Sequence, residues 1–514
     1  MATKHFARVF TAQTEGIDGH IVSVETDLAR GLYSFSVVGL PDKAVEEARD
    51  RLSAAIKHSG FPSPKSHNRK VVISLAPASL KKEGSHFDLP MALAYLLASE
   101  DINFEPKKSS FLGELGLDGT LRRVKGVLAL TRAAKEAGFE KIFLPKENAE
   151  EAALVGGIEI YGAESLLEVV EHLDEKKMEG KKKSGKKIDK TPRTKIKNDE
   201  VAGMNLSDIR GQASAKRGLE IAAAGRHNIA LYGPAGTGKT MLARAASSIL
   251  PPLSEEEALE VTAIHSVAGA LDGTYISNPP FRSPHHTASY VSVVGGGSTP
   301  RPGEVTLAHR GVLFLDEFPE FERRVIETLR QPLEENVVTV SRAKGTYRFP
   351  ANFMLIAAMN PCPCGNYGTT KRCICTPGDM ARYQRKLSGP IVDRIDMWLE
   401  VPLIPHTDLL GKKGGEESSS VLERVSRARN IQEKRYGETA KTNSDLSARE
   451  LEKLELGEKV KDTLIQSAAR LALSPRATHR VMKLSRTIAD LAGSEIIELP
   501  HLLEALQYRP KINT

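Results

Sequence analysis

Residues 233–240 read Gly233-Pro234-Ala235-Gly236-Thr237-Gly238-Lys239-Thr240, which fits the phosphate-loop pattern G-x-x-x-x-G-K-[ST]. An apolar run at 228–232 predicts a buried strand before it, and 241–250 predicts a helix after it. In such a loop the backbone N–H groups and the helix dipole hold phosphate oxygens. We expect Lys239 to contact the β- and γ-phosphates of ATP and Thr240 to bind Mg²⁺. The alternative is a glycine-rich turn without a ligand, and the strand–loop–helix context favours the nucleotide.

Composition sets broad limits on the protein. A chain of 514 residues is too long for one core and predicts about three or four domains. The net charge of +7 permits a polyanionic partner without requiring one, and 5% aromatic residues argue against a nucleic-acid surface based on stacking. No apolar run approaches the roughly 18 residues of a membrane span. The first residues lack the apolar core of a signal peptide, so we expect a cytoplasmic protein.

A second apolar run, 312–315, is followed by Asp316 and Glu317. It predicts a buried parallel strand with two carboxylates at its carboxyl end, where α/β sheets bind ligands. Asp316 is expected to hold Mg²⁺, largely through water, and Glu317 to act as general base on the attacking water. An apolar run ending in Asp-Glu is common by itself, but here it follows a phosphate loop in the same domain.

Four cysteines form the spacing C-x-C-x₈-C-x-C within 362–375: Cys362, Cys364, Cys373 and Cys375. Four thiolates suit a tetrahedral structural Zn²⁺, and in a reducing compartment a metal is favoured over disulfides. Metal-free thiols and an iron–sulfur cluster remain alternatives. For the adjacent His285 and His286 we expect a structural or nucleotide-sensing role in preference to metal binding.

Three strings carry a family resemblance: 280–289, 311–317 and 359–365. Together they resemble the magnesium-chelatase-like AAA+ ATPases of the YifB/ComM family, and the resemblance covers nearly the whole chain except 174–200. It implies a P-loop ATPase core with a parallel sheet, followed by a helical lid. It also implies ring assembly as a homo-oligomer, with a hexamer expected, and a DNA helicase that drives branch migration in recombination or natural transformation.

The resemblance also implies roles for single residues in the ATP site. Gly211 and Gln212 would line the adenine pocket. Asn360 matches the sensor-one position, whose amide orients water near the γ-phosphate; the alternative is an asparagine that caps the turn before Pro361.

Two arginines match positions that complete an AAA+ site. Arg394 would be the finger inserted into the neighbouring subunit's site, where a guanidinium stabilises charge on the transferred phosphoryl group. The alternative is a surface arginine paired with Asp393 or Asp396. Arg476 matches sensor two and would reach the nucleotide from the lid, with Arg480 as a second candidate and a plain surface arginine as the alternative.

Residues 337–349 predict two strands around a turn, with Arg342 and Lys344 at the tip. In related ring helicases such a hairpin reaches into the pore, so these side chains are DNA-binding candidates that would contact phosphates without distinguishing sequence. The alternative is a solvated basic hairpin.

The segment 1–173 predicts an independent α+β domain. Its expected strands are 19–25, 32–38, 70–75 and 141–144, and its expected helices are 43–59, 88–98, 125–137 and 166–173. Its stretches 82–90 and 113–148 resemble Lon-type proteases. The positions of the family's catalytic serine and lysine fall on His86 and Leu128, which cannot form that nucleophile–base pair. The resemblance therefore implies a Lon-protease-like fold without peptidase activity.

The expected fold is multidomain α/β, and the segments below complete the domain prediction. Residues 174–200 are rich in lysine and predict a basic flexible linker, with salt-sensitive DNA contact as a second possibility. The ATPase core is expected at 201–405 and the helical lid at 406–514. ATP, Mg²⁺ and a structural Zn²⁺ are the expected cofactors. We expect an ATPase that moves along single-stranded or branched DNA; the alternative is a chelatase-type factor that remodels proteins without DNA translocation.

Overall fold

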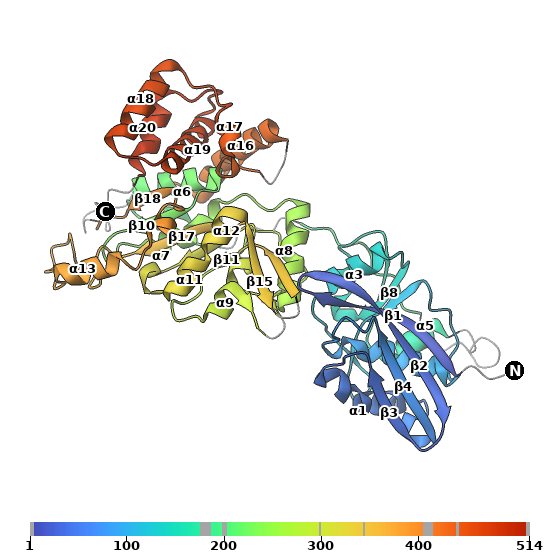
Figure 1. Ribbon diagram of the computed structural model, residues 1–514. Coiled ribbons are helices and arrows are strands. Elements are labelled where there is room, and N and C mark those ends of the chain that lie inside the picture. Colours follow the sequence, from blue (N-terminus) through green and yellow to red (C-terminus); the bar gives the residue numbers. More distant parts are fainter. Residues whose placement is uncertain are drawn as a thin grey trace. The chain divides into compact units, whose positions relative to one another are not determined.

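The computed structural model describes residues 5–174, 187–197, 203–297, 300–342, 345–404, 415–437 and 441–509. The chain divides into two compact units, each described here by itself (Figure 1). The first comprises Met1–Ile196 and Thr262–Tyr275, and the second comprises Lys197–Val261 and Ile276–Thr514. Within the described ranges no helix is both long and apolar enough to cross a membrane.

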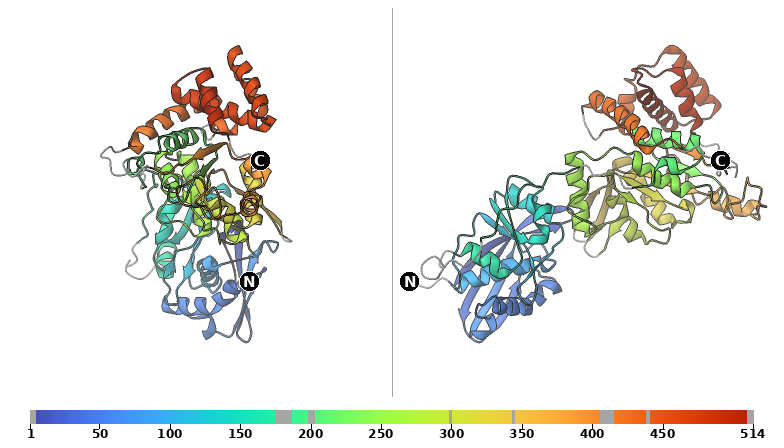
Figure 2. Two further views of the ribbon diagram at one scale, coloured as in Figure 1. Left: turned by 90° about the vertical axis from the view of Figure 1, so that its left-hand side faces the viewer. Right: turned by 180° about the vertical axis from the view of Figure 1, so that it is seen from behind.

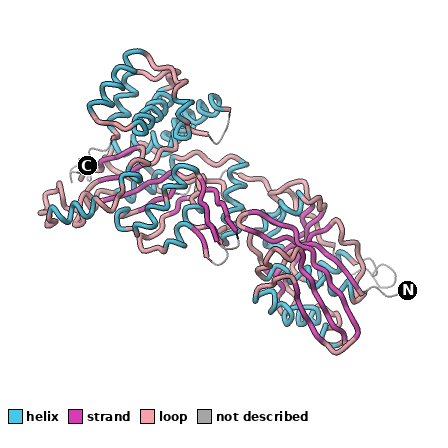
Figure 3. The backbone as a smooth tube through the Cα atoms, viewed as in Figure 1, coloured by secondary structure: helices cyan, strands magenta, loops and turns pink. Residues whose placement is uncertain are grey.

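The first unit contains a seven-stranded sheet in the order β3-β4-β2-β1-β5-β8-β9, whose long strands are drawn in magenta in Figure 3. β1, β2 and β4 pair antiparallel, and the remaining neighbours pair parallel. The strands are β1 Phe6–Glu15, β2 Asp18–Arg30, β3 Ser34–Val38, β4 Arg69–Ala76, β5 Ser109–Phe111, β8 Lys141–Pro145 and β9 Glu159–Ala163, with β6 Glu114–Leu115 and β7 Leu121–Arg122 in a separate pair.

Helices cover both faces of this sheet because successive strand residues point in opposite directions. Phe143 of β8 belongs to one buried cluster, whereas its neighbours Ile142 and Leu144 belong to another. The Phe143 cluster includes residues of α1 Lys43–His58, α2 Asp88–Ala98 and α5 Leu166–Leu173; the other includes residues of α3 Val127–Glu136 and α4 Ala149–Ala152. The unit is the mixed α/β fold that the sequence predicts.

The basic segment 174–200 is described only in part. Ile188 is 7% exposed, and the N–H groups of Thr191 and Thr194 donate to Ile160 (2.9 Å) and Ala153 (3.3 Å). Lys190 forms an ion pair with Glu159 at 3.1 Å. Residues 187–196 therefore belong to the first unit, whereas 175–186 and 198–200 lie outside the described residues.

The second unit is built on a five-stranded sheet in the order β11-β14-β17-β10-β18, with every neighbouring pair parallel. The strands are β10 Ile229–Tyr232, β11 Phe281–Arg282, β14 Val312–Leu315, β17 Met354–Met359 and β18 Met397–Glu400. Every residue of β14 and β17 is buried, as continuous apolar runs in a parallel sheet covered on both faces should be.

Further helices and short strands complete the part of this unit that surrounds the five-stranded sheet. They are α6 Ala213–Gly225, α7 Lys239–Ala246, α9 Tyr290–Val294, α10 Glu304–Leu307, α11 Arg323–Thr328, α12 Arg330–Glu335, α13 Pro377–Gln384 and α14 Gly389–Val392, with β12 Gly295–Gly296, β13 Arg301–Pro302, β15 Val337–Arg342 and β16 Gly345–Pro350. The boundary between the units falls inside α8 Glu255–Ala268.

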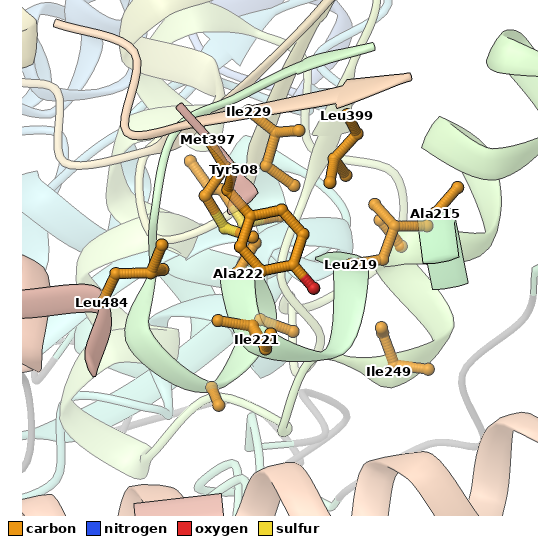
Figure 4. Packing of buried hydrophobic residues seen from close by; sticks show 14 of the residues in the cluster. Ala215, Leu219, Ile221, Ala222, Ile229, Ile249, Met397, Leu399, Leu484 and Tyr508 are labelled. Atoms are coloured by element: carbon orange, nitrogen blue, oxygen red, sulfur yellow. The ribbon is translucent and has the colours of Figure 1, made fainter. Parts of the chain in front are cut away.

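The core of the second unit surrounds α6 (Figure 4). Leu219 and Ile221 of this helix pack in the same cluster as Ile229 and Leu399 of the sheet and Leu484 of the carboxyl-terminal helices. Each fully buried side chain of this kind contributes about 1.5–3 kcal/mol. The five-stranded sheet and the carboxyl-terminal helical region therefore share one hydrophobic core.

The carboxyl-terminal helices appear in orange and red in Figures 1 and 2: α16 Ser418–Tyr436, α17 Ala448–Leu451, α18 Glu458–Arg470, α19 Pro475–Ala492 and α20 Leu499–Gln507. Arg429 and Gln432 of α16 donate to the last-turn carbonyls of Ala223 and Ala224 in α6, at 2.7 and 3.1 Å. Helix ends leave such carbonyls without partners inside the helix, so α16 satisfies them and fixes the helical region to the core.

Candidate active site

Four chain segments reach the carboxyl edge of the five-stranded sheet. The phosphate loop follows β10, Asp316 and Glu317 follow β14, and Asn360 follows β17. The segment with His286 follows β11, which pairs with β14. Because all these strands are parallel, their carboxyl ends lie along one edge, which is where such sheets bind ligands.

The phosphate loop has the open backbone that a phosphate requires. Gly236 and Gly238 have φ values of +78° and +86°, and no atom lies within 4 Å of the position a Cβ would take at either residue. Side chains are disfavoured at these dihedrals, and their absence leaves room for a ligand against the backbone. At Gly233 a Cβ would lie 2.2 Å from the Val401 carbonyl oxygen, so this glycine is required by close packing.

Lys239 lies at the start of α7 and is 7% exposed. Its Nζ donates to the carbonyls of Gly233 (2.8 Å) and Pro234 (2.7 Å) and to Oδ1 of Asn360 (3.1 Å). Burial lowers the pKa of Lys239, and the Asp316 carboxylate opposes that shift. The structure thus brings the predicted phosphate-binding lysine and the predicted sensor-one asparagine into contact.

The two predicted Mg²⁺ ligands also meet. The Thr240 hydroxyl donates to Oδ2 of Asp316 at 2.8 Å, and the other carboxylate oxygen accepts the Glu317 N–H at 2.9 Å. Mg²⁺ prefers hard oxygen ligands together with several waters. A hydroxyl and a carboxylate beside the phosphate loop fit that preference.

Glu317 has an unusual backbone, with φ +50° and ψ 44°. A non-glycine residue in this left-handed region costs about 1–3 kcal/mol, and such strain concentrates at functional sites. Its carboxylate lies 3.2 Å from Nδ1 of His286, and its side chain is 54% exposed. The sequence drew attention to His286 without indicating a partner, because the two residues lie on separate loops.

Gln212, a predicted adenine-pocket residue, connects the phosphate loop to the segment after β18. It has φ +55°, next to Gly211 with φ +60°. Its side-chain amide donates to the carbonyls of Pro402 (2.8 Å) and Thr237 (3.3 Å). Its Oε1 is buried and has no hydrogen-bond partner among the described residues. An unpaired buried acceptor of this kind suits an amino group such as that of adenine.

Arg394 lies at the opposite edge of the sheet. It precedes β18, and its carbonyl accepts the side-chain amide of Asn228, which precedes β10, at 3.4 Å. These two strands pair over four residues, or about 13 Å, before the phosphate loop begins. Arg394 is 9% exposed and contacts Glu334 Oε1 at 2.6 Å and the Pro390 carbonyl at 2.7 Å.

The two lid arginines lie on the same side as Arg394. Nη1 of Arg476 is 3.7 Å from the same Glu334 oxygen, and its side chain is 67% exposed. Arg480 contacts Oδ1 of Asp396 at 3.0 Å, and that carboxylate also accepts the Asn228 N–H at the amino end of β10. Within the described residues, no contact links Arg476 or Arg480 to the chain's own phosphate loop.

The four cysteines form one cluster. Sulfur–sulfur distances are 3.4 Å for Cys362–Cys364, 3.6 Å for Cys364–Cys373 and 3.8 Å for Cys362–Cys373, and all four sulfurs lie within 4.8 Å of one another. Tetrahedral Zn²⁺ with Zn–S bonds of about 2.3 Å requires sulfurs about 3.8 Å apart. The four thiols therefore fit Zn²⁺.

The cysteine cluster is adjacent to the phosphate loop. Cys362 follows Asn360 by two residues, and the Gly365 carbonyl accepts the Ala235 N–H at 3.4 Å. Backbone N–H groups of Asn366 and Ile374 lower the pKa of the Cys364 thiol to about 6, which favours the thiolate that metals bind. One turn thus carries a nucleotide-site residue and two of the metal-ligand candidates.

The predicted hairpin is present. β15 and β16 pair antiparallel from Val337↔Pro350 to Arg342↔Gly345, and Arg342 is exposed beside the turn. Lys344 lies outside the described residues.

In the first unit, the positions of a Lon-type serine and lysine hold His86 and Leu128. Leu128 is fully buried, and burial lowers the pKa of His86 to about 4. The adjacent Ser85 donates its hydroxyl hydrogen bond to Glu114. A buried leucine offers no base, so the Ser–Lys chemistry of Lon proteases has no counterpart at these positions.

Comparison with known proteins places this architecture. The model of magnesium chelatase subunit ChlI matches residues 205–409, that of subunit ChlI of Mg-chelatase matches 24–148, and that of the ChlI C-terminal region matches 415–509. Competence protein ComM of Haemophilus influenzae is 43% identical over 511 residues, which cover 98% of both chains. The chain belongs to the YifB/ComM family of ChlI-like proteins.

One further relative supports this placement, and another resembles part of the chain. YifB of Escherichia coli is 43% identical over 508 residues, covering 98% of this chain and 96% of YifB. An archaeal Lon protease of Methanocaldococcus jannaschii is 26% identical over 174 residues, which are 33% of this chain. As a ChlI-like protein, the chain carries the magnesium-chelatase AAA+ ATPase domain next to a Lon-like first unit.

Proposed function

We propose that this protein is a ring-forming ATPase that uses hydrolysis to move on DNA. One observation carries the ATPase part: Lys239 with Asn360, and Thr240 with Asp316, meet at the carboxyl edge of one parallel sheet. Phosphate-binding, metal-binding and water-orienting groups converge there, as phosphoryl transfer to water requires.

The residues divide the chemistry among them. Lys239 and the loop N–H groups hold the β- and γ-phosphates, and Thr240 and Asp316 hold Mg²⁺. The bound ion would neutralise charge on the phosphate oxygens. Glu317 takes the proton from the attacking water, and Asn360 orients that water. Gln212 and Gly211 border the base.

The position of Arg394 supports a ring. Its side chain lies at the amino edge of the sheet, about 13 Å of strand away from its own phosphate loop, so a finger role requires a neighbour's nucleotide. Arg476 shares Glu334 with Arg394 and would serve the same neighbouring site. We therefore propose a homo-oligomer, with six subunits as in the ring that the family resemblance implies.

The exposed hairpin supports DNA as the partner. Arg342 lies beside its turn, and Lys344 follows it two residues later in the sequence. The whole chain carries a net charge of +7. Basic side chains on such a tip contact phosphates of any sequence. The name of the relative ComM, a competence protein, points in the same direction.

We expect Arg342→Ala with Lys344→Ala to abolish DNA-stimulated ATP hydrolysis and to leave basal hydrolysis unchanged, because only the phosphate contacts are lost. The assay measures hydrolysis with single-stranded, double-stranded and branched DNA at two salt concentrations, since phosphate contacts weaken as salt rises. The charge-matched control is Arg427→Ala with Lys434→Ala, at two exposed positions of α16, which should behave as wild type.

The alternative is a chelatase-type factor that remodels proteins, which the match to magnesium chelatase ChlI favours. It would use the same ATP site without DNA translocation. A wild-type protein whose hydrolysis DNA never stimulates would rule out the DNA motor and leave this alternative.

We also expect one Zn²⁺ per chain after purification under reducing conditions, held by the four cysteines as a structural ion. Removing it with a chelator, or by Cys364→Ser, should weaken nucleotide binding about 5-fold or more, because Gly365 between the ligands contacts Ala235 of the phosphate loop. Elemental analysis and titration with a fluorescent nucleotide measure the two effects. A metal content far below one per chain would refute the zinc assignment.

A further inference from the structure

Glu334 contacts both Arg394 and Arg476, although it belongs to none of the ATP-site motifs. One of its oxygens, Oε1, lies 2.6 Å from Nη2 of Arg394 and 3.7 Å from Nη1 of Arg476. The carboxylate thus stands between two guanidinium groups, as a phosphate oxygen would in a neighbour's site. Glu334 is itself partly exposed, with 46% of its side chain accessible.

The Arg394 side chain is held against its own subunit by these contacts. Only 9% of the residue is exposed, its Nη1 donates to Pro390, and its Nε has no hydrogen-bond partner within the described residues. An arginine held in this way cannot extend to another subunit's phosphate. It must first leave Glu334, whose negative charge is the contact that retains it.

Glu334 is also connected to the hairpin, because its helix leads directly into the first hairpin strand. It lies in α12, which ends at Glu335 and is capped by Asn336 with φ +55°, and β15 begins at the residue after Asn336. The Gln331 side chain of α12 donates to Thr339 Oγ1 at 3.0 Å and accepts the Thr339 N–H at 3.3 Å. These bonds fasten the first strand of the hairpin to the helix that carries Glu334.

We propose that Glu334 is a positioning residue that couples the hairpin to the arginine finger. In the resting subunit Glu334 retains Arg394 and attracts Arg476. A displacement of the hairpin by DNA moves α12, withdraws Glu334 and releases Arg394 toward the neighbouring nucleotide. This inference rests on the proposed function, since it takes DNA as the hairpin's partner and the neighbour's ATP as the target of Arg394.

The test compares basal and DNA-stimulated hydrolysis of Glu334→Gln in the full chain. Glutamine keeps the shape and an acceptor but removes the charge, so Arg394 is released without DNA. We expect the basal rate to rise about 5-fold or more and the ratio of stimulated to basal rate to fall toward one. The matched control is Glu322→Gln, an exposed glutamate at the start of α11, which should keep the wild-type ratio.

A second variant removes the connection between α12 and the hairpin. Gln331→Ala leaves Glu334 and Arg394 in place but removes the bonds to Thr339. Its basal rate should stay at the wild-type level while the stimulation by DNA falls, whereas Glu334→Gln should raise the basal rate. A general loss of structure would lower both rates together in both variants.

The outcomes separate this inference from the function beneath it. If DNA stimulates the wild type and Glu334→Gln keeps both wild-type rates, or loses both equally, the coupling role is overturned and the DNA motor stands. If DNA does not stimulate the wild type, the proposed function falls and the coupling falls with it. Mixing Arg394→Ala with Lys239→Ala subunits checks the finger separately, since regained activity requires Arg394 to act on a neighbour.

Discussion

Glu317→Gln is expected to reduce ATP turnover about 100- to 10,000-fold while ATP binding is retained, because glutamine cannot accept the proton of the attacking water. The substitution changes neither the phosphate loop nor the Thr240–Asp316 pair. Turnover is measured by phosphate release and binding by titration with a fluorescent ATP analogue. Glu322→Gln, a nearby exposed glutamate, is the control and should keep normal turnover.

Normal turnover in Glu317→Gln would remove the residue from the role of base. His286 contacts the Glu317 carboxylate at 3.2 Å and so helps to hold it beside the site. Glu317 also has a strained left-handed backbone, and such strain concentrates where a side chain is positioned for function.

The largest effect on stability is expected for Asp490→Ala. Asp490 has a fully buried side chain that contacts Arg435 at 2.5 Å, Arg486 at 2.9 Å and the Asn443 amide at 2.7 Å. Removing the carboxylate leaves two guanidinium groups without their counter-charge, which costs about 3–5 kcal/mol for buried pairs. Denaturant unfolding of the full chain, followed by circular dichroism, should show the transition of the second unit at lower denaturant.

The control is Asp462→Ala, at an exposed position of α18, which should change stability by less than about 0.5 kcal/mol. Equal stability of the two variants would contradict the structural role of Asp490. The polar network around Asp490 also connects two parts of the second unit. Asn443 and His227 both contact Thr487 of α19, at 3.1 and 2.8 Å, so the buried polar groups link the helical region to the end of α6.

Much of the fold follows from local pattern. Helix α2 spans the predicted Asp88–Ala98, and β14 and β17 coincide with apolar runs whose ends carry Asp316 and Asn360. Strands β1, β5 and β9 lacked a sequence prediction, although β1 lies in the middle of the first sheet. β1 includes polar residues such as Thr11 and Gln13, which are buried through tertiary packing, so hydrophobic alternation indicates it poorly.

The candidate site divides in a similar way. The phosphate loop, Asp316 and Glu317 are contiguous motifs at strand ends, and parallel pairing alone brings them together. The clustering of the four cysteines also followed from their spacing.

The sequence by itself determined the α/β fold class, the phosphate loop and the two acidic residues after β14, because these depend on periodicity and on residues adjacent in the chain. Only the tertiary structure decided that Thr262–Tyr275 belongs with the first unit, that His286 meets Glu317, and that Glu334 holds Arg394. The partners in the last pair are 60 residues apart, and which side chains meet at such separations is set by how strands and helices pack, which no local pattern records.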